Sequence, residues 1–124
     1  MLFDRFMLSI EFMEKEELAN LAKWNEMAKN HEKSEFYDVD GFLKGDLKLD
    51  DIEQVGFPDI SGKKLLHLQC HFGLSTLSWA RLGADVTGVD FSDSAIDIAR
   101  NLSKDSGVSA RLYGFCGCVM IYVR

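Results

Sequence analysis

Proline, cysteine and long apolar runs are scarce in this chain of 124 residues. Pro58 is the single proline, so few positions forbid a regular helix or strand. Three cysteines make an odd number, and the first residues, MLFDRFMLSIEF, show no cleavable targeting signal. We therefore expect reduced thiols and a cytoplasmic protein. No apolar run approaches the roughly 18 residues of a membrane-spanning helix, so we expect no membrane partner.

Acidic side chains are absent from residues 106–124, although the preceding residues hold all 20 of them. This change of composition favours a truncated or frame-shifted end of the chain. The competing interpretation is that Val119–Val123 forms a genuine fourth, β-branched strand. We favour truncation, because a composition shift is the stronger of the two signals.

The net charge of −6 excludes a broad nucleic-acid or anionic-membrane surface, since phosphate binding needs clustered lysine and arginine. An apolar fraction of 47% and a charged fraction of 27% are those of a globular protein. The length allows one domain. A small-molecule or protein substrate is what this composition favours, while a nucleic-acid substrate reached through a local basic patch stays open. The sequence does not indicate an oligomeric state.

The stretch 63–100 alternates between strand and helix signals. Lys64–Gln69 is a short, mostly apolar run of the kind that a parallel sheet buries. Gly73 ends this run and opens a helix with apolar residues Leu74, Leu77 and Ala80. A turn at 82–84 precedes a β-branched strand, Asp85–Val89, and a third strand is expected over about Ala110–Tyr113. The order predicts an α/β fold with a Rossmann-like parallel sheet.

Asp90 is the strongest candidate for a binding residue, because it stands where the second strand should end. A carboxylate at that point can accept two hydrogen bonds from ribose hydroxyls. Its alternative role, capping the next helix, is already filled by Ser92. Phe91 and Ile96 match the hydrophobic staple that surrounds such a cap.

These segments resemble motif I and the following strand of class I S-adenosylmethionine-dependent methyltransferases, whose usual form is LDLGCGTG, a helix, then VTGVDxS. Leu66–Gly73 aligns with the first part and Gly88–Ser92 with the second. The string LQCHFG is similar to that of a subset of the superfamily. The resemblance implies S-adenosylmethionine as cofactor, methyl transfer to an unknown acceptor, and the following cofactor-binding residues: Gln69, Cys70, His71, Gly73, Asp90, Phe91 and Ser92.

Two of the three motif glycines are replaced, by Gln69 and His71. Glycines in such a bend permit unusual backbone angles and close approach of a ligand. His71 and Phe72 would crowd a pyrophosphate, whereas S-adenosylmethionine has no phosphates. An NAD-binding Rossmann protein is therefore the less favoured alternative.

Residues 1–60 are expected to form a helical lead-in, and residues 61–124 the N-terminal half of the Rossmann-like domain. A helix is predicted over Glu14–Asn30, with Glu17, Leu21, Trp24, Ala28 and His31 on one stripe. Gly41, Gly45 and 46–53 indicate a loop with a short helical turn. By resemblance the segment is a lid over the cofactor, and Trp24, His31, Phe36 and Tyr37 line its mouth; alternatively they are packing aromatics and a helix-end histidine.

No catalytic residue can be named from this sequence. His67, Cys70 and His71 suggest a metal site, but a closed zinc site needs a further ligand, and only Cys116 and Cys118 could supply a thiolate. We expect no metal, and we expect Cys70 to be a small buried residue. Ser75 and Thr76 fall in a helical first turn whose N–H groups could face an anion. The rival function is that of a non-catalytic fragment or interaction module.

Overall fold

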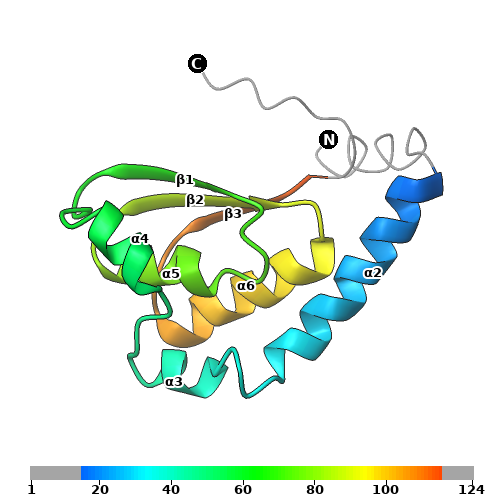
Figure 1. The fold of residues 1–124 in the computed structure, drawn as a ribbon, viewed down its shortest axis with the longest axis horizontal. Coiled ribbons are helices and arrows are strands. Elements are labelled where there is room, and N and C mark those ends of the chain that lie inside the picture. Colours follow the sequence, from blue (N-terminus) through cyan, green and yellow to red (C-terminus); the bar gives the residue numbers. More distant parts are fainter. Residues whose placement is uncertain (1–14, 116–124) are drawn as a thin grey trace.

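The computed structural model describes residues 15–115, and these form one parallel sheet with helices (Figure 1). The elements follow in this order: α2 (Lys15–Glu32), α3 (Val39–Leu43), α4 (Asp51–Gly56), β1 (Lys64–Leu68), α5 (Leu74–Arg81), β2 (Asp85–Asp90), α6 (Asp93–Ser106) and β3 (Arg111–Gly114). The predicted α/β class with a parallel sheet is confirmed. No helix in the described part is long and apolar enough to cross a membrane.

The three strands lie in the order β1-β2-β3, and each neighbouring pair is parallel. Leu66 of β1 pairs with Thr87 of β2, and Thr87 pairs in turn with Arg111 of β3. Because parallel neighbours need a crossover, α5 connects β1 to β2 and α6 connects β2 to β3. The carboxyl ends of all three strands therefore meet at one edge of the sheet.

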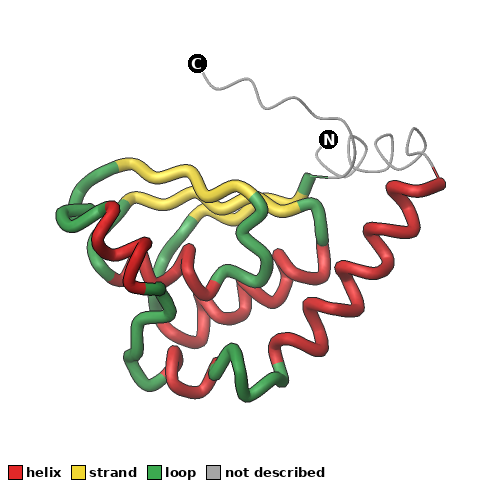
Figure 2. Tube along the Cα trace, in the orientation of Figure 1, coloured by secondary structure: helices red, strands yellow, loops and turns green. Residues whose placement is uncertain are grey.

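Helices α5 and α6 cover the same face of the sheet, and α2 packs against α6 on the side away from the strands (Figure 2). On the covered face, Val86 is 2% exposed and Leu112 is 6% exposed. On the opposite face, Leu66, Leu68 and Tyr113 remain 44%, 57% and 46% exposed. Among the described residues, this second face has no helix on it.

The core lies between the sheet and the helices. Its largest fully buried side chains are Phe42, Phe72, Leu77 and Ile96. Arg81 joins α5 to α3, because its guanidinium lies 4.1 Å from the centre of the Phe42 ring and donates hydrogen bonds to the carbonyls of Phe42 and Asp46. The short α3 is thereby fixed on the main helical layer.

The structure corrects two predicted boundaries. The third strand is Arg111–Gly114, one residue later than expected, and its outer end lies next to Asp90. Gly41 lies inside helix α3 and not in a loop, because the Asp38 carboxylate accepts the Gly41 N–H and starts a helical turn. The alternative strand at Val119–Val123, which the composition shift made the less favoured interpretation, lies outside the described residues.

The long helix α2 confirms the predicted lead-in helix, but its apolar stripe is shallow. Glu16 and Glu17 lie in its first turn, and Lys29 and His31 in its last, as the helix dipole favours. Of its 18 residues only Ala28 is fully buried, and Trp24 is 43% exposed. Packing alone therefore holds α2 to the rest of the molecule only weakly.

Candidate functional site

The bend between β1 and α5 has an unusual backbone. Gln69, His71 and Gly73 all have positive φ angles, of 52°, 53° and 84°. A left-handed backbone is ordinary for glycine, but it costs roughly 1–2 kcal/mol at a residue with a side chain. The two non-glycine residues thus keep the left-handed conformation that glycine adopts without this cost.

Asp90 lies at the carboxyl end of β2, and its side chain points toward this bend. One carboxylate oxygen, Oδ2, accepts the backbone N–H of His71 at 2.8 Å. The other, Oδ1, accepts the backbone N–H of Ser92 at 2.8 Å. Each carboxylate oxygen can accept a further hydrogen bond, so the side chain remains able to bind hydroxyl groups. This is the orientation on which the ribose prediction depends.

Ser92 begins helix α6, as predicted. Its hydroxyl oxygen accepts the Ala95 N–H at 3.1 Å, and the same hydroxyl donates to Oδ1 of Asn25 in α2 at 2.6 Å. Ser92 is 1% exposed, so its side chain holds the helix and cannot also reach a ligand. Phe91 is half-buried beside it and Ile96 is fully buried, in agreement with the expected staple positions.

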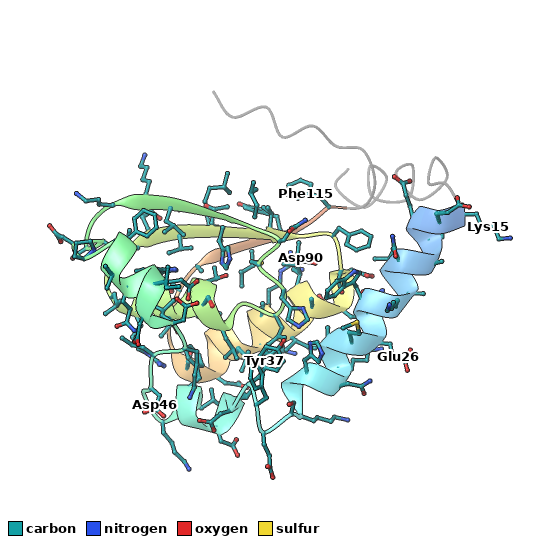
Figure 3. All side chains as sticks on the ribbon, in the orientation of Figure 1. Lys15, Glu26, Tyr37, Asp46, Asp90 and Phe115 are labelled. Atoms are coloured by element: carbon teal, nitrogen blue, oxygen red, sulfur yellow. The ribbon has the colours of Figure 1, made fainter. Side chains whose placement is uncertain are left out.

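The His71 ring projects from the bend toward α2. Its Nε2 atom lies 3.0 Å from Nδ1 of His31, so a hydrogen bond joins the bend to α2, 40 residues away in the sequence. The rings of Trp24 and Tyr37 lie 6.1 and 6.0 Å from the His71 ring, and Tyr37 also stacks on His31 at 4.9 Å. Burial lowers the pKa of His71, and the neighbouring His31 lowers it further. Figure 3 labels Tyr37 and Asp90, of which Asp90 lies nearer the sheet.

Three of the four predicted mouth residues, Trp24, His31 and Tyr37, thus gather around His71. Phe36 lies one ring further out: it is 87% exposed, meets Tyr37 at an interplanar angle of 88°, and lines the pocket beside the bend. Phe72, which was expected to crowd a ligand, is 1% exposed and packs against Tyr37 in the core. Of the two bulky residues in the bend, only His71 remains partly accessible.

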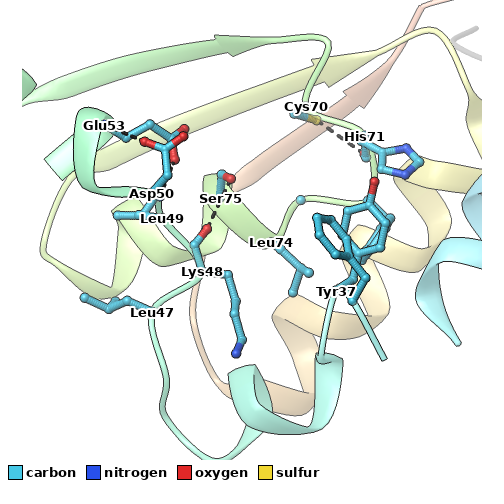
Figure 4. A pocket seen from close by; sticks show the side chains of 13 residues that line it. Tyr37, Leu47, Lys48, Leu49, Asp50, Glu53, Cys70, His71, Leu74 and Ser75 are labelled. Carbon is cyan, nitrogen blue, oxygen red and sulfur yellow. Dashed lines mark hydrogen bonds between the residues drawn. The ribbon is translucent and has the colours of Figure 1, made fainter. Parts of the chain in front are cut away.

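A pocket of about 470 Å³ opens beside the bend (Figure 4). Tyr37 and His71 lie on one side of it, and Asp50 and Glu53 on the other. Cys70, Gly73 and Ser75 lie between these sides. The two carboxylates are already engaged, because Asp50 accepts the Glu53 N–H and Glu53 accepts the Asp50 N–H in a capping box.

The start of α5 faces this pocket, and no side chain of the described residues caps it. Gly73 occupies the N-cap position, where its lack of a side chain leaves the first-turn N–H groups without a side-chain acceptor. The two hydroxyls considered from the sequence are used elsewhere: Ser75 donates to the Lys48 carbonyl, and Thr76 bonds Nδ1 of His67. Any anion at this helix start would therefore contact backbone N–H groups.

Cys70 is buried at the turn, as expected, with 4% of its surface exposed. Burial raises the pKa of its thiol to about 12, so the thiol is protonated and unreactive near neutral pH. His67 and Cys70 both hydrogen-bond to Thr76, and Cys70 lies beyond the end of β1 at Leu68. In residues 15–115 no group of three or more metal-binding side chains comes together, and Cys116 and Cys118 lie outside the described residues.

Sequence reasoning missed two contributors to the site. Asn25 accepts the Ser92 hydroxyl and the Ser94 N–H, although nothing in the helical pattern of α2 distinguished it from a surface residue. The Lys48 backbone is held on α5 by Ser78 and Ser75, which shapes the far wall of the pocket. A polar residue inside a helix is common on exposed surfaces, so the positions of Asn25 and Ser78 carry no sequence signal for these contacts.

Comparison with known proteins finds relatives by sequence, and no family model matches the chain. A ubiquinone biosynthesis O-methyltransferase of Shewanella halifaxensis is 33% identical over 93 residues, which cover 71% of this chain and 37% of that protein. The mitochondrial ubiquinone biosynthesis O-methyltransferase of Schizosaccharomyces pombe is 45% identical over 60 residues, 48% of this chain and 22% of that protein. The chain thus spans little more than a third of the first of these curated relatives and less than a quarter of the second.

Among solved structures, an S-adenosylmethionine-dependent methyltransferase from Clostridium acetobutylicum has a TM-score of 0.47 and 24% identity, and the match covers 74% of this chain and 36% of that one. A structure described for the conversion of a disulfide bond into a thioacetal group in echinomycin biosynthesis has a TM-score of 0.45 and 31% identity. That match covers 52% of this chain and 26% of the other.

Proposed function

The chain belongs to the class I S-adenosylmethionine-dependent methyltransferases, and from this we propose that it binds S-adenosylmethionine at the carboxyl ends of β1 and β2. S-adenosylmethionine is the cofactor of that family, in which it supplies an electrophilic methyl group on a sulfonium. In this proposal Asp90 accepts the ribose hydroxyls, and residues 1–60 cover the cofactor while 61–124 provide the sheet.

The observation that carries the proposal is the hydrogen bond from the His71 N–H to Asp90. It fixes the carboxylate beside the bend and leaves free lone pairs on both oxygens, which suits two ribose hydroxyls. The uncapped start of α5 suits the methionine carboxylate. Gln69, Cys70, His71 and Gly73 form the bend between these two points, whereas Phe91 and Ser92 support Asp90 from behind.

The lining of the pocket agrees with a cofactor that has no phosphates. Lys48 is the one cation among the described lining residues, and its ammonium is paired with Asp38 at 2.7 Å and with Asp46 at 3.7 Å. A pyrophosphate would meet two acidic side chains, Asp50 and Glu53, with no unpaired cation opposite. This argues against a dinucleotide and in favour of a sulfonium nucleoside.

We propose a hydroxyl group of a small molecule as the methyl acceptor, by analogy with relatives that are named O-methyltransferases. In such a transfer the new bond joins the methyl carbon to the acceptor oxygen. The S–CH₃ bond breaks and its electron pair stays on sulfur, while the hydroxyl proton passes to a base. The protein's part is to position the two reactants.

Titration calorimetry tests cofactor binding. The wild-type protein should bind S-adenosylhomocysteine and show no heat with NAD⁺. Asp90→Asn should weaken binding roughly 10- to 100-fold, because it removes a charged hydrogen-bond acceptor. Asp97→Asn on α6, whose side chain is exposed and pairs only with Arg100, is the matched control and should leave affinity unchanged. Binding of NAD⁺, or equal effects of the two variants, would contradict the proposal.

The second candidate function is a binding module without turnover. It is favoured by one observation: the Nε2 atom of His71, the one imidazole among the described lining residues, is already hydrogen-bonded to His31. We expect the chain to bind cofactor with negligible transfer. Incubation with S-adenosylmethionine carrying a labelled methyl group and with catechol as acceptor measures this directly, and labelled methylcatechol would reject the module in favour of an enzyme.

A further inference from the structure

Helix α2 and the Asp90 carboxylate are joined at two separate points. At one, Nδ1 of His31 is bonded to Nε2 of His71, whose backbone N–H donates to Asp90 Oδ2. At the other, Oδ1 of Asn25 accepts the Ser92 hydroxyl, and the Ser92 N–H donates to Asp90 Oδ1. The contacts close a ring that runs from α2 through the bend to Asp90 and back to α2 through the start of α6.

We propose that α2 sets the affinity for cofactor through this ring: Asn25 and His31 are positioning residues for Asp90, and double protonation of the His31–His71 pair releases the helix. The proposal rests on the proposed function, because Asp90 is there the ribose-binding group. It goes beyond that function by assigning positioning roles to two residues outside the predicted cofactor-binding set.

Polar contacts can control α2 because few of its side chains are fully buried. Ala28 is its one fully buried residue, and Trp24 leaves 43% of its surface in water. A helix with so little buried surface can detach while the sheet stays folded, as weakly packed elements do in local opening. Losing the contacts of Asn25 or His31 therefore shifts the position of α2 without unfolding the core.

The histidine pair is sensitive to protons because of its geometry. Two neutral imidazoles 3.0 Å apart share one hydrogen, so that one ring donates and the other accepts. One added proton preserves this bond. A second leaves N–H donors on both facing atoms and places two positive charges next to each other, which repel.

The groups around the pair shift the protonation of His71 in opposite directions. The Asp90 carboxylate, held on the His71 N–H, favours protonation of His71, whereas burial and the His31 charge oppose it. Tyr37 stacks on His31, and Trp24 meets the His71 ring edge-on. Burial and His31 outweigh Asp90 in lowering the pKa of His71, so acidification is the direction of release.

The first test needs no cofactor. The chain has three histidines, so side-chain NMR titration of histidine-labelled protein resolves each of them. His31 and His71 should titrate in two coupled steps, and His31→Ala should raise the midpoint of His71. His67, bonded to Thr76 on β1, serves as the internal control and should not move. Independent titration of His31 and His71 in the wild-type protein, with a His71 midpoint that His31→Ala leaves unchanged, would overturn the release mechanism.

The second test measures affinity for S-adenosylhomocysteine by calorimetry at about pH 7.5 and pH 5.5, with circular dichroism to verify folding. Asn25→Ala and His31→Ala should each weaken binding about tenfold at the higher pH. The wild-type protein should bind more weakly at the lower pH. His31→Asn places a neutral amide near the position of Nδ1, so it should keep the affinity at the higher pH and abolish this loss of affinity at the lower one. Glu26→Gln and Lys29→Gln, both exposed on α2, are the controls.

A double-mutant cycle then distinguishes positioning from general stability. In an Asp90→Asn background, Asn25→Ala should lose most of its effect, because its action passes through Asp90. Equal effects in both backgrounds would refute the coupling while leaving cofactor binding intact. A folded wild-type protein that binds no S-adenosylhomocysteine would instead refute the proposed function, and the histidine titration would still decide whether the pair holds α2.

Discussion

At the scale of single residues, the bend after β1 keeps a left-handed backbone at two positions that carry side chains. Gln69 and His71 have φ angles of 52° and 53°. The His71 ring gains contacts with His31 and three aromatic rings, whereas Gln69 is exposed. The cost of the left-handed backbone is therefore offset at His71 and not at Gln69.

We predict that Gln69→Gly stabilises the protein by about 0.5–1 kcal/mol, because glycine adopts a positive φ without steric cost. Urea unfolding measures the change. Gln54→Gly, at an exposed position inside α4, is the control and should destabilise by a similar amount. If both variants lost stability equally, the strain assigned to Gln69 would be wrong.

At the scale of elements, glycines in the left-handed region mark the start of α5 and the end of α6. Gly73 has a φ of 84° and Gly107 a φ of 71°. They differ in surroundings, because a methyl group on Gly73 would lie 3.0 Å from Cβ of Ala99, whereas one on Gly107 would meet no atom within 4 Å. The first glycine thus serves both backbone and packing, and the second only the backbone.

Substituting each glycine with alanine separates these two requirements. Gly107→Ala should cost about 1 kcal/mol from backbone strain alone. Gly73→Ala should cost about 2–3 kcal/mol, since it adds overpacking against α6. Chemical denaturation of both variants gives the comparison, and equal losses would show that the contact with Ala99 is easily relieved.

The elements were well predicted where a local signal existed. The strand pattern placed β1 and β2, and the Ser92 cap fixed the start of α6, because alternation and capping are local properties. Gly41 was assigned to a loop, because the Asp38 side chain that starts α3 is visible only in the structure. The direction of the Asp90 side chain was predicted, but its link to Asn25 was not, since that contact spans most of the chain.

At the scale of the whole molecule, two partly buried histidines make stability depend on pH. Burial lowers the pKa of His67 and of His71 below the ordinary value of 6.5. The unfolded chain therefore takes up protons at these sites before the folded protein does. The stabilising effect of the neutral rings is complete above about pH 6.5 and is lost as the pH falls toward the folded-state pKa values.

We predict that the free energy of unfolding in urea falls between about pH 7.5 and pH 5. His67→Asn should reduce this dependence, because it removes one of the two groups while its amide can still bond Thr76. His31 lies in the same contact as His71, so His31→Asn should also alter the slope. A flat profile for the wild-type protein would contradict the assigned burial effect.

Every described helix lies on one side of the sheet, so one face of the sheet is covered and the other is exposed to solvent. The exposed face carries the apolar side chains of Leu66, Leu68 and Tyr113. It also carries the ion pair of Arg111 with Asp85, in which Nη2 lies 2.6 Å from Oδ1. Charged groups that border apolar strands oppose self-association, because a second copy would have to desolvate them. Neutralising Arg111 or Asp85 would therefore favour self-association through this face more than the loss of a charge on α2 would.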